Sequence, residues 1–379
     1  MDQKLAVLFM PDDMTLTKEQ APLMLRPILF CPILTWMVEE LMGWGIERFF
    51  IVSDKRAHDM MRPYVPENAD VVYVDGARHG EELLTLLKDE KGSVLIVNGA
   101  VLPVGVFSGG AVYSADAKEC CKVLKEHGAF AAFPKGAEIT KGFLPVGDDE
   151  ELRAAQDMCR RKIADKHFAA GVSIMDVNNT YIDPRVKIGS GTVILPGTIL
   201  RGRTVIGKNC TIGPNAMIRD CVIGDETEVN ASQLSESTVG SHTNVGPFAY
   251  VRPNSTIGDH VKVGDFVEIK NSVIGNGTKI SHLTYVGDSD CGERINFGCG
   301  TVTTNYDGFK KFRCTIGDDA FIGCNTNLIA PVTVGNGSYI AAGSTITDEV
   351  PADSLALARS RQVNKPGWAV TWRAAHEKK

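Results

Sequence analysis

Residues 182–213, IDPRVKIGSGTVILPGTILRGRTVIGKNCTIG, carry an aliphatic side chain at every sixth position. The period runs on to residue 346, with occasional steps of five and one interruption, and glycine often follows the aliphatic residue. The aliphatic positions are Ile182, Ile188, Ile194, Leu200, Ile206, Ile212, Ile218, Ile223, Val229, Leu234, Val239, Val245, Val251, Ile257, Val263, Ile269, Ile274, Ile280, Val286, Ile316, Ile322, Leu328, Val334, Ile340 and Ile346. A hexapeptide repeat of this kind is the signature of a parallel β-helix.

In such a β-helix, three hexapeptides form one triangular coil of about 18 residues. The aliphatic residue points into the prism, and glycine eases the turn at the corner. Strands of successive coils then stack at the spacing of neighbouring strands in a sheet. We therefore expect an all-β domain over residues 171–355, followed by a basic tail over residues 356–379.

The first half of the chain has a different pattern, in which apolar runs of strand length alternate with helical segments. Strands are expected at 5–10, 48–53, 71–74 and 93–98, and helices at 32–41 and 81–88. This order indicates a mostly parallel, Rossmann-like sheet covered by helices. We expect this α/β domain to occupy residues 1–147, with a charged connecting helix over residues 148–170.

The composition restricts the classes of partner. A formal net charge of −6 speaks against nucleic acid or an anionic membrane surface. Ten cysteines without a Cys-x-x-Cys pair indicate free thiols in a reducing compartment. The N-terminal apolar run is too short for a signal peptide, and no apolar run approaches the ~20 residues of a membrane span. We expect a cytoplasmic protein without a membrane partner.

Two cations replace the glycine that follows the aliphatic residue in the middle of the repeat. Arg252 and Lys270 are 18 residues apart, so they are expected to stack on one edge of the prism, about 5 Å apart. Such a pair repels unless an anion lies between the two charges. It is either a phosphate clamp or a surface pair neutralised by Glu268 or Asp265.

A histidine and a loop also break the repeat. His282 follows Ile280 by two residues, and its pKa near neutrality suits it to accept a proton from an amine, although a structural histidine is the alternative. The period disappears over residues 298–313, GCGTVTTNYDGFKKFR. A loop leaving a solenoid is where binding residues commonly lie, although a tolerated insertion is the alternative.

The quoted loop, together with GPFAYVRPNSTIGDHVKVGDFVEIK, SHLTYVGD and ARSRQVNKPGW, resembles the acetyltransferase half of the bifunctional GlmU family. The resemblance extends from about residue 171 to 368. It implies that the β-helix is left-handed and forms a homotrimer with its sites at subunit interfaces. It also implies acetyl transfer from acetyl-CoA to the amine of glucosamine 1-phosphate, on the way to UDP-N-acetylglucosamine.

The resemblance also assigns residues. His282 stands at the position of the general base. The sugar-phosphate ligands are implied at Arg252, Lys270, Tyr285, Asn296 and Lys311. The acetyl-CoA contacts are implied at Cys299, Asn305, Tyr306, Cys324, Ala342 and Arg359. The two cysteines replace the alanine or serine of some members, and all three residue types are small.

The first half looks like a shortened, degenerate form of the family's uridylyltransferase domain. LFMPDDMTLT stands where the family has a glycine-rich phosphate loop, and Asp12 and Asp13 would repel a triphosphate. Leu23 replaces the family's lysine, while Ala100 and Gly147 replace its two magnesium ligands. Because phosphoryl transfer depends on positioned cations and metal, we expect neither uridylyltransferase activity nor a magnesium site.

These expectations favour a glucosamine-1-phosphate N-acetyltransferase that has lost its second activity. Two alternatives stay open: an acetyltransferase for another amino-sugar phosphate, and a non-catalytic trimer that senses acetyl-CoA or a UDP-sugar.

Overall fold

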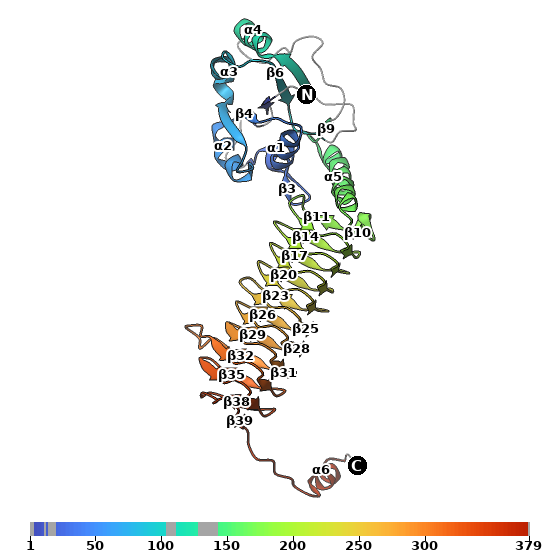
Figure 1. Cartoon of the computed structure of the whole chain (residues 1–379), viewed down its shortest axis with the longest axis vertical. Helices are drawn as coiled ribbons and strands as arrows, with labels where there is room; N and C mark the ends of the chain where they lie inside the picture. The colour runs from blue at the N-terminus through green and yellow to red at the C-terminus, as the bar shows by residue number, and fades with distance from the viewer. Residues whose placement is uncertain (1–3, 11–12, 14–19, 104–110, 128–142, 378–379) are drawn as a thin grey trace. The chain divides into compact units, whose positions relative to one another are not determined.

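The computed structural model describes residues 4–377 except 11–12, 14–19, 104–110 and 128–142. It divides into two compact units (Figure 1). The first contains Met1–Ala169 and Tyr181–Arg185, and the second contains Ala170–Thr180 and Val186–Lys379. The expected connecting helix is α5 (Asp149–Ala169), which belongs to the first unit.

The first unit is built on a five-stranded sheet of order β5-β4-β1-β6-β8. Its strands are β1 (Leu5–Phe9), β4 (Arg48–Ser53), β5 (Asp70–Asp75), β6 (Ser93–Asn98) and β8 (Ala111–Asp116). The first four are parallel, as expected, and β8 adds an antiparallel edge that the sequence pattern did not indicate.

Helices cover this sheet, and short elements connect them. The helices are α1 (Ile33–Gly43), α2 (Lys55–Met61), α3 (His79–Leu87) and α4 (Ala117–His127), with the 3₁₀ turns η2 (Leu23–Leu25), η3 (Arg62–Tyr64) and η4 (Gly76–Arg78). Two small antiparallel pairs join β2 (Pro27–Ile28) to β3 (Cys31–Pro32) and β7 (Val101–Pro103) to β9 (Phe143–Pro145). The predicted helices correspond to α1 and α3, whereas α2 and α4 were not predicted.

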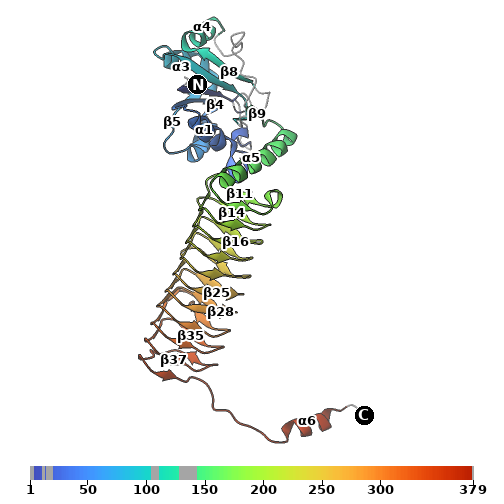
Figure 2. The ribbon, with the colours of Figure 1, turned by 45° about the vertical axis from the view of Figure 1, so that its right-hand side comes forward.

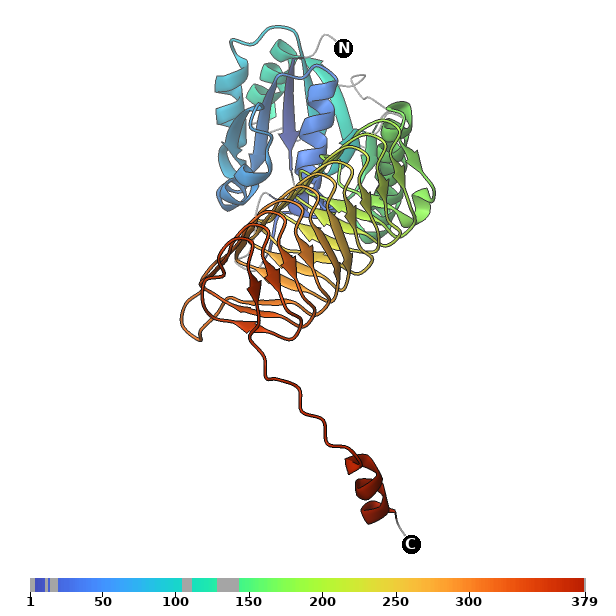
Figure 3. The same ribbon diagram turned by 60° about the horizontal axis from the view of Figure 1, so that its bottom comes forward.

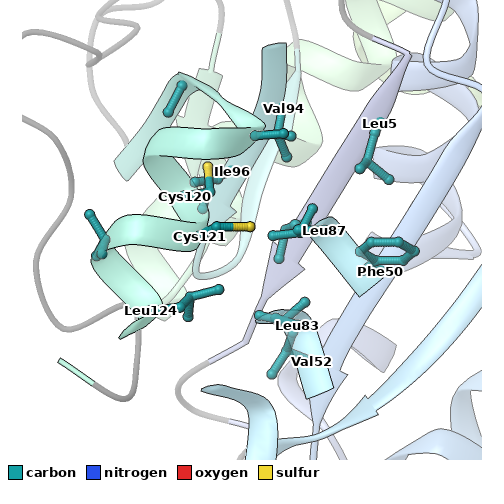
Figure 4. Packing of buried hydrophobic residues seen from close by; sticks show 14 of the residues in the cluster. Leu5, Phe50, Val52, Leu83, Leu87, Val94, Ile96, Cys120, Cys121 and Leu124 are labelled. Carbon is teal, nitrogen blue, oxygen red and sulfur yellow. The ribbon is translucent and has the colours of Figure 1, made fainter. Parts of the chain in front are cut away.

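Alternate residues of the strands fill the space under α3 and α4. Leu5 and Val7 of β1 pack with Phe50 and Val52 of β4 in one buried cluster. Leu83 and Leu87 of α3 and Cys120, Cys121 and Leu124 of α4 close this cluster (Figure 4). The two-residue period of the contributing strand positions is what a sheet needs to present one apolar face to its helices.

The second unit is a parallel β-helix made of three parallel sheets, called here the first, second and third face (Figure 2). The first face contains β10 (Ser173–Ile174), β13 (Val193–Ile194), β16 (Thr211–Ile212), β19 (Glu228–Val229), β22 (Asn244–Val245), β25 (Lys262–Asp265), β28 (Lys279–His282), β31 (Asn296–Phe297), β34 (Phe321–Ile322), β37 (Tyr339–Ile340) and β39 (Leu355–Ala356). The second face contains β14 (Ile199–Arg201), β17 (Met217–Arg219), β20 (Gln233–Ser235), β23 (Tyr250–Val251), β26 (Glu268–Lys270), β29 (Tyr285–Gly287), β32 (Val302–Thr304), β35 (Asn327–Ile329) and β38 (Thr345–Ile346). In the sheet order β14 follows β11 (Tyr181–Ile182), whose residues were assigned above to the first unit.

The third face contains β12 (Lys187–Ile188), β15 (Val205–Ile206), β18 (Val222–Ile223), β21 (Thr238–Val239), β24 (Thr256–Ile257), β27 (Val273–Ile274), β30 (Ser289–Cys291), β33 (Cys314–Ile316) and β36 (Val332–Val334). The short turn η5 (Val177–Asn179) and the helix α6 (Trp368–His376) complete the unit. The predicted coils are confirmed, because equivalent aliphatic residues pair between neighbouring coils, as Ile188 does with Ile206. Figure 3 shows the coils stacked along the prism.

Buried hydroxyl groups hold the corners of neighbouring coils together. The Thr243 hydroxyl donates to the carbonyl of Gly258 at 2.9 Å and accepts from the amide of Val261 at 3.1 Å. Equivalent threonines and serines repeat this pattern, so the corner amides and carbonyls are satisfied inside the prism. Among the described residues, no helix has the length and apolar character needed to cross a membrane.

Candidate active site

The two predicted cations lie side by side at the corner that follows the second face. The Arg252 amide donates to the carbonyl of Ile269 at 2.8 Å, which places Arg252 next to Lys270 in the neighbouring coil. Each cation has its own carboxylate. Arg252 Nη1 lies 2.8 Å from Glu268 Oε1, and Lys270 Nζ lies 3.3 Å from Asp288 Oδ2.

Asp288 is a buried carboxylate that holds the side chains of this corner, and the sequence pattern did not predict this role. Its side chain accepts hydrogen bonds from Lys270, from Asn305 and, at 2.5 Å, from Asn271. Burial alone would raise the pKa of Asp288, but these donors hold it below its ordinary value. The carboxylate therefore stays charged and fixes the Lys270 side chain.

Lys311 brings a third positive charge to the same corner. Its amine is exposed, and the hydrogen bond and charge of neighbouring Lys270 lower the pKa of Lys311. In residues 4–377, as far as they are described, no carboxylate lies within 4.0 Å of the Lys311 amine. A corner with three cations and two carboxylates presents a surplus of positive charge to solvent, which suits an anionic ligand.

Tyr285 lies along the second face and reaches the same corner. Its hydroxyl is 3.3 Å from Nδ2 of Asn305. A Cβ atom at Gly287 would lie 2.2 Å from that hydroxyl, so glycine is required beneath the Tyr285 side chain. The structure thus gathers Lys270, Tyr285 and Asn305 of the predicted set at one corner.

His282 lies at a different corner, at the end of the first face. It ends β28, and Tyr285 begins β29 on the next face three residues later. The Nδ1 atom of His282 is 2.6 Å from Oδ1 of Asp265, its partner in the register of β25 and β28. Asp265 therefore pairs with the histidine and neutralises neither predicted cation.

The predicted acetyl-CoA residues continue the column of His282 along the first face. The register aligns Ile280, Phe297, Ile322 and Ile340 in successive coils. His282, Cys299, Cys324 and Ala342 each come two residues after one of these positions. The amide of Gly343 donates to the Cys324 carbonyl at 2.8 Å, and a Cβ atom on Gly343 would lie 3.7 Å from Cδ of Arg359.

The predicted loop residues form a tight hairpin between β32 and β33. Tyr306 and Lys311 form an isolated antiparallel bridge, and the Tyr306 hydroxyl donates to the carbonyl of Gly308 at 2.6 Å. Asn296 is the exception within the predicted sugar-phosphate set. It lies on the first face, between Lys279 and Phe321 in register, and not at the Lys270 corner.

Comparisons with known proteins match the hexapeptide repeats of the β-helix. Residues 236–271 and 313–348 match the family model "Bacterial transferase hexapeptide (six repeats)", and residues 203–231 match "Hexapeptide repeat of succinyl-transferase". Bifunctional protein GlmU of a Geobacillus strain is 48% identical over 247 residues, which are 65% of this chain and 54% of that protein. GlmU of Clostridium acetobutylicum is 56% identical over 240 residues, 62% of this chain and 53% of that protein.

The chain is similar to GlmU over this part of its length. It spans about half the length of the curated GlmU proteins that it matches. The matches confirm the expected left-handed β-helix of hexapeptide repeats. Among solved structures, an Arabidopsis UDP-N-acetylglucosamine acyltransferase is similar with a TM-score of 0.34 and 18% identity, covering 49% of this chain and 69% of that one.

The structure describes the surroundings of the residues of the α/β unit that the resemblance singled out. Asp13 is buried, and its carboxylate accepts the amides of Leu23 at 2.7 Å and Met24 at 3.3 Å. Ala100 is buried and offers no side-chain oxygen. The Gly147 amide donates to Oε2 of Glu151 at 2.8 Å. Asp12 lies outside the described residues.

One groove of the α/β unit contains none of the predicted site residues. It measures about 670 Å³ between α3 and α4, and its lining includes Leu84, Leu87, Lys118, Cys121 and Lys122. The groove does not coincide with any position that the GlmU resemblance assigns, so it plays no part in the chemistry considered next.

Proposed function

We propose that this protein transfers the acetyl group of acetyl-CoA to the amine of glucosamine 1-phosphate, yielding N-acetylglucosamine 1-phosphate for UDP-N-acetylglucosamine synthesis. The observation that carries the proposal is the cation corner of Arg252, Lys270 and Lys311. A phosphate there would accept charge-assisted hydrogen bonds from all three side chains. Its negative charge would also relieve the repulsion that lowers the pKa of Lys311.

The histidine corner supplies the base that the reaction needs. An amine must be neutral to attack the thioester, and its proton must leave as the amide bond forms. His282 accepts that proton on Nε2, because its Nδ1 is hydrogen-bonded to Asp265. The column of Cys299, Cys324 and Ala342 offers small side chains along which acetyl-CoA would extend from the His282 corner.

We also propose that the working form is a homotrimer. Phe248, Phe266 and Leu283 form an exposed apolar ladder on the corner that carries His282, and the two phenylalanine rings stack with centroids 5.5 Å apart. An apolar patch of this kind favours cover by another protein surface. A second copy placed there would lie against His282 and add its own surface to the proposed site.

The α/β unit is proposed to lack uridylyltransferase activity and its magnesium ion. Neither Ala100 nor Gly147 has a side-chain oxygen for a hard cation. Leu23 has no charge to place on a triphosphate. The reducing cytoplasm is the proposed compartment, because all ten cysteines are free thiols and eight of them are buried.

The test mixes purified protein with acetyl-CoA and glucosamine 1-phosphate and follows the release of free thiol. Thiol release that depends on the sugar phosphate supports the proposal. Faster release with galactosamine 1-phosphate would instead favour the other amino-sugar substrate. Binding of acetyl-CoA without any thiol release would favour the sensing trimer.

Two further measurements test the rest of the proposal. Adding UTP and magnesium to the same reaction should produce no UDP-N-acetylglucosamine, and its appearance would overturn the proposed loss. Light scattering should give three times the chain mass of 41.0 kDa. A monomer under assay conditions would contradict the trimer.

A further inference from the structure

The carboxylate of Asp265 is held against His282 by the two coils that carry them. Oδ1 of Asp265 is 2.6 Å from Nδ1 of His282. Both residues end four-residue strands, whereas most strands of the first face have two residues. The strand pairing therefore continues past the aliphatic pair Val263–Ile280 as far as Asp265 and His282.

Two backbone features fix this local extension. A Cβ atom at Gly264 would lie only 1.9 Å from the carbonyl oxygen of Ser281, so the absence of a side chain lets the two coils approach. The amide of Leu283 then donates to the carbonyl of Asp265 at 2.9 Å, directly beyond the side-chain pair. The backbone contacts before and after the pair therefore fix the positions of the Asp265 carboxylate and the His282 imidazole relative to each other.

The hydrogen bond decides which ring nitrogen is basic. An ionised carboxylate can only accept, so Nδ1 of His282 carries the proton and Nε2 keeps the lone pair. The hydrogen bond from His282 keeps the pKa of Asp265 below its ordinary value, so this carboxylate is charged at neutral pH. The other charged residues on β25 and β28 are Lys262 and Lys279, which are paired in register. The positive charge of Lys262 also lowers the pKa of Asp265.

We propose that Asp265 is a positioning residue for His282, which holds the imidazole in the tautomer that exposes Nε2 and stabilises the imidazolium formed during acetyl transfer. The inference rests on the proposed function. The neutral amine forms the C–N bond to the acetyl carbon while the C–S bond breaks. The proton released from nitrogen passes to Nε2, and the imidazolium then returns it to the departing thiolate. Asp265 itself neither gains nor loses a proton.

The test compares Asp265→Asn with a matched pair elsewhere in the same β-helix. Asparagine keeps the size and one acceptor oxygen but removes the charge. We expect kcat to fall about tenfold to 100-fold, while KM for the sugar phosphate changes less than about threefold. Glu226→Gln is the control, because Glu226 lies 3.3 Å from Nδ1 of His242 in a second carboxylate–histidine pair. This control should leave kcat unchanged.

A pH profile separates positioning from a merely structural effect. Removing the carboxylate destabilises the imidazolium, so the acid limb of kcat/KM should move to lower pH in Asp265→Asn. An unchanged limb with unchanged kcat would overturn the proposal. Asp265→Ala, with its unfolding midpoint, gives a second measurement in case the asparagine variant folds poorly. If His282→Ala retains full turnover, the proposed function fails; if only Asp265→Asn retains it, the positioning role alone fails.

Discussion

The β-helix and the α/β unit differ in how the chain fixes a functional residue. In the β-helix, the repeat assigns side chains to corners, so counting 18 residues from Arg252 predicts that it lies beside Lys270. In the α/β unit, the positions assigned by resemblance lie on connections between helices and strands. No repeat fixes these positions, and each depends on the contacts of its own loop. The difference teaches that a solenoid fixes the position of a side chain through its repeat, whereas the position of a side chain on a connection depends on its local contacts.

The sharpest test of the β-helix half is His282→Ala. The imidazole is the only base that we place at the first-face corner, so its loss should reduce kcat by about 10²- to 10⁴-fold. The measurement is thiol release from acetyl-CoA with saturating glucosamine 1-phosphate. The same variant should bind acetyl-CoA as tightly as the parent protein. Wild-type turnover would sink the assignment of the base.

The cation corner is tested by Arg252→Met against Arg219→Met. Arg252 pairs with Glu268 in the proposed site, and Arg219 pairs in the same way with Glu236 on an earlier coil of the same face. Loss of a charge-assisted hydrogen bond to phosphate should raise KM for the sugar phosphate about 10- to 100-fold in Arg252→Met. KM for acetyl-CoA should stay unchanged in both variants. Equal effects of the two substitutions would show that the corner is not special.

A stability comparison uses one glycine from each unit. Gly264→Ala forces a Cβ atom against the Ser281 carbonyl of the next coil, which should destabilise the β-helix by about 1–3 kcal/mol. Gly43→Ala, at the end of α1, meets no atom within 4 Å and should change stability by less than about 1 kcal/mol, in the stabilising direction. Urea unfolding followed by circular dichroism measures both. A neutral Gly264→Ala would mean that the coils have room to separate.

The smallest expected effect is a difference in pH dependence between the units. Burial lowers the pKa of His167 in α5 to about 4. As the pH falls, His167 of the unfolded chain is protonated near pH 6.5, whereas His167 of the folded chain is protonated only near pH 4. The α/β unit is therefore most stable above about pH 6.5 and loses stability as the pH falls toward 4. We expect a loss of about 1–2 kcal/mol at pH 5. The pKa of Asp288 is also lowered, so its contribution to the stability of the β-helix is likewise lost as the pH falls, but only below about pH 4.

Fluorescence of the buried Trp36 reports on the α/β unit and measures this difference. The urea concentration at the midpoint of the fluorescence transition should be lower at pH 5 than at pH 8. The midpoint of the circular dichroism transition of the β-helix should be the same at both pH values. His167→Gln should remove the dependence from the α/β unit. A parallel shift of both transitions would show that the two units unfold together.

Much of the β-helix could be predicted from the sequence because one rule is applied again in each coil. Counting one coil of 18 residues from Arg252 gives Lys270. The next coil has 17 residues, so Gly287 pairs with Lys270 in register, and the buried carboxylate of Asp288 comes one residue after that position. The repeat places Asp265 and His282 in one column, two residues after Val263 and Ile280, but it does not predict the pairing of their side chains. That pairing depends on how far β25 and β28 extend past their aliphatic pair, which is set by the close backbone approach at Gly264.

The α/β unit was less predictable for a physical reason. β8 and α4 consist largely of small or charged residues, AVYSAD and AKECCKVLKEH, whose burial comes from tertiary packing and not from a long apolar run. α2 had a usable local signal, because the Asp54 carboxylate accepts the amide of Arg56 at its first turn. The strands β1, β4 and β6 were found because each is a continuous apolar run.

The Asp13 carboxylate has a consequence for any attempt to engineer nucleotide binding into the α/β unit. It already accepts the amides of Leu23 and Met24, and it is attached to the same chain, so its effective concentration at those amides is far above that of any dissolved anion. A nucleotide phosphate arriving there would have to displace a tethered competitor. We therefore expect glycines and metal ligands introduced into this unit to be insufficient for nucleotide binding unless Asp13 is replaced as well.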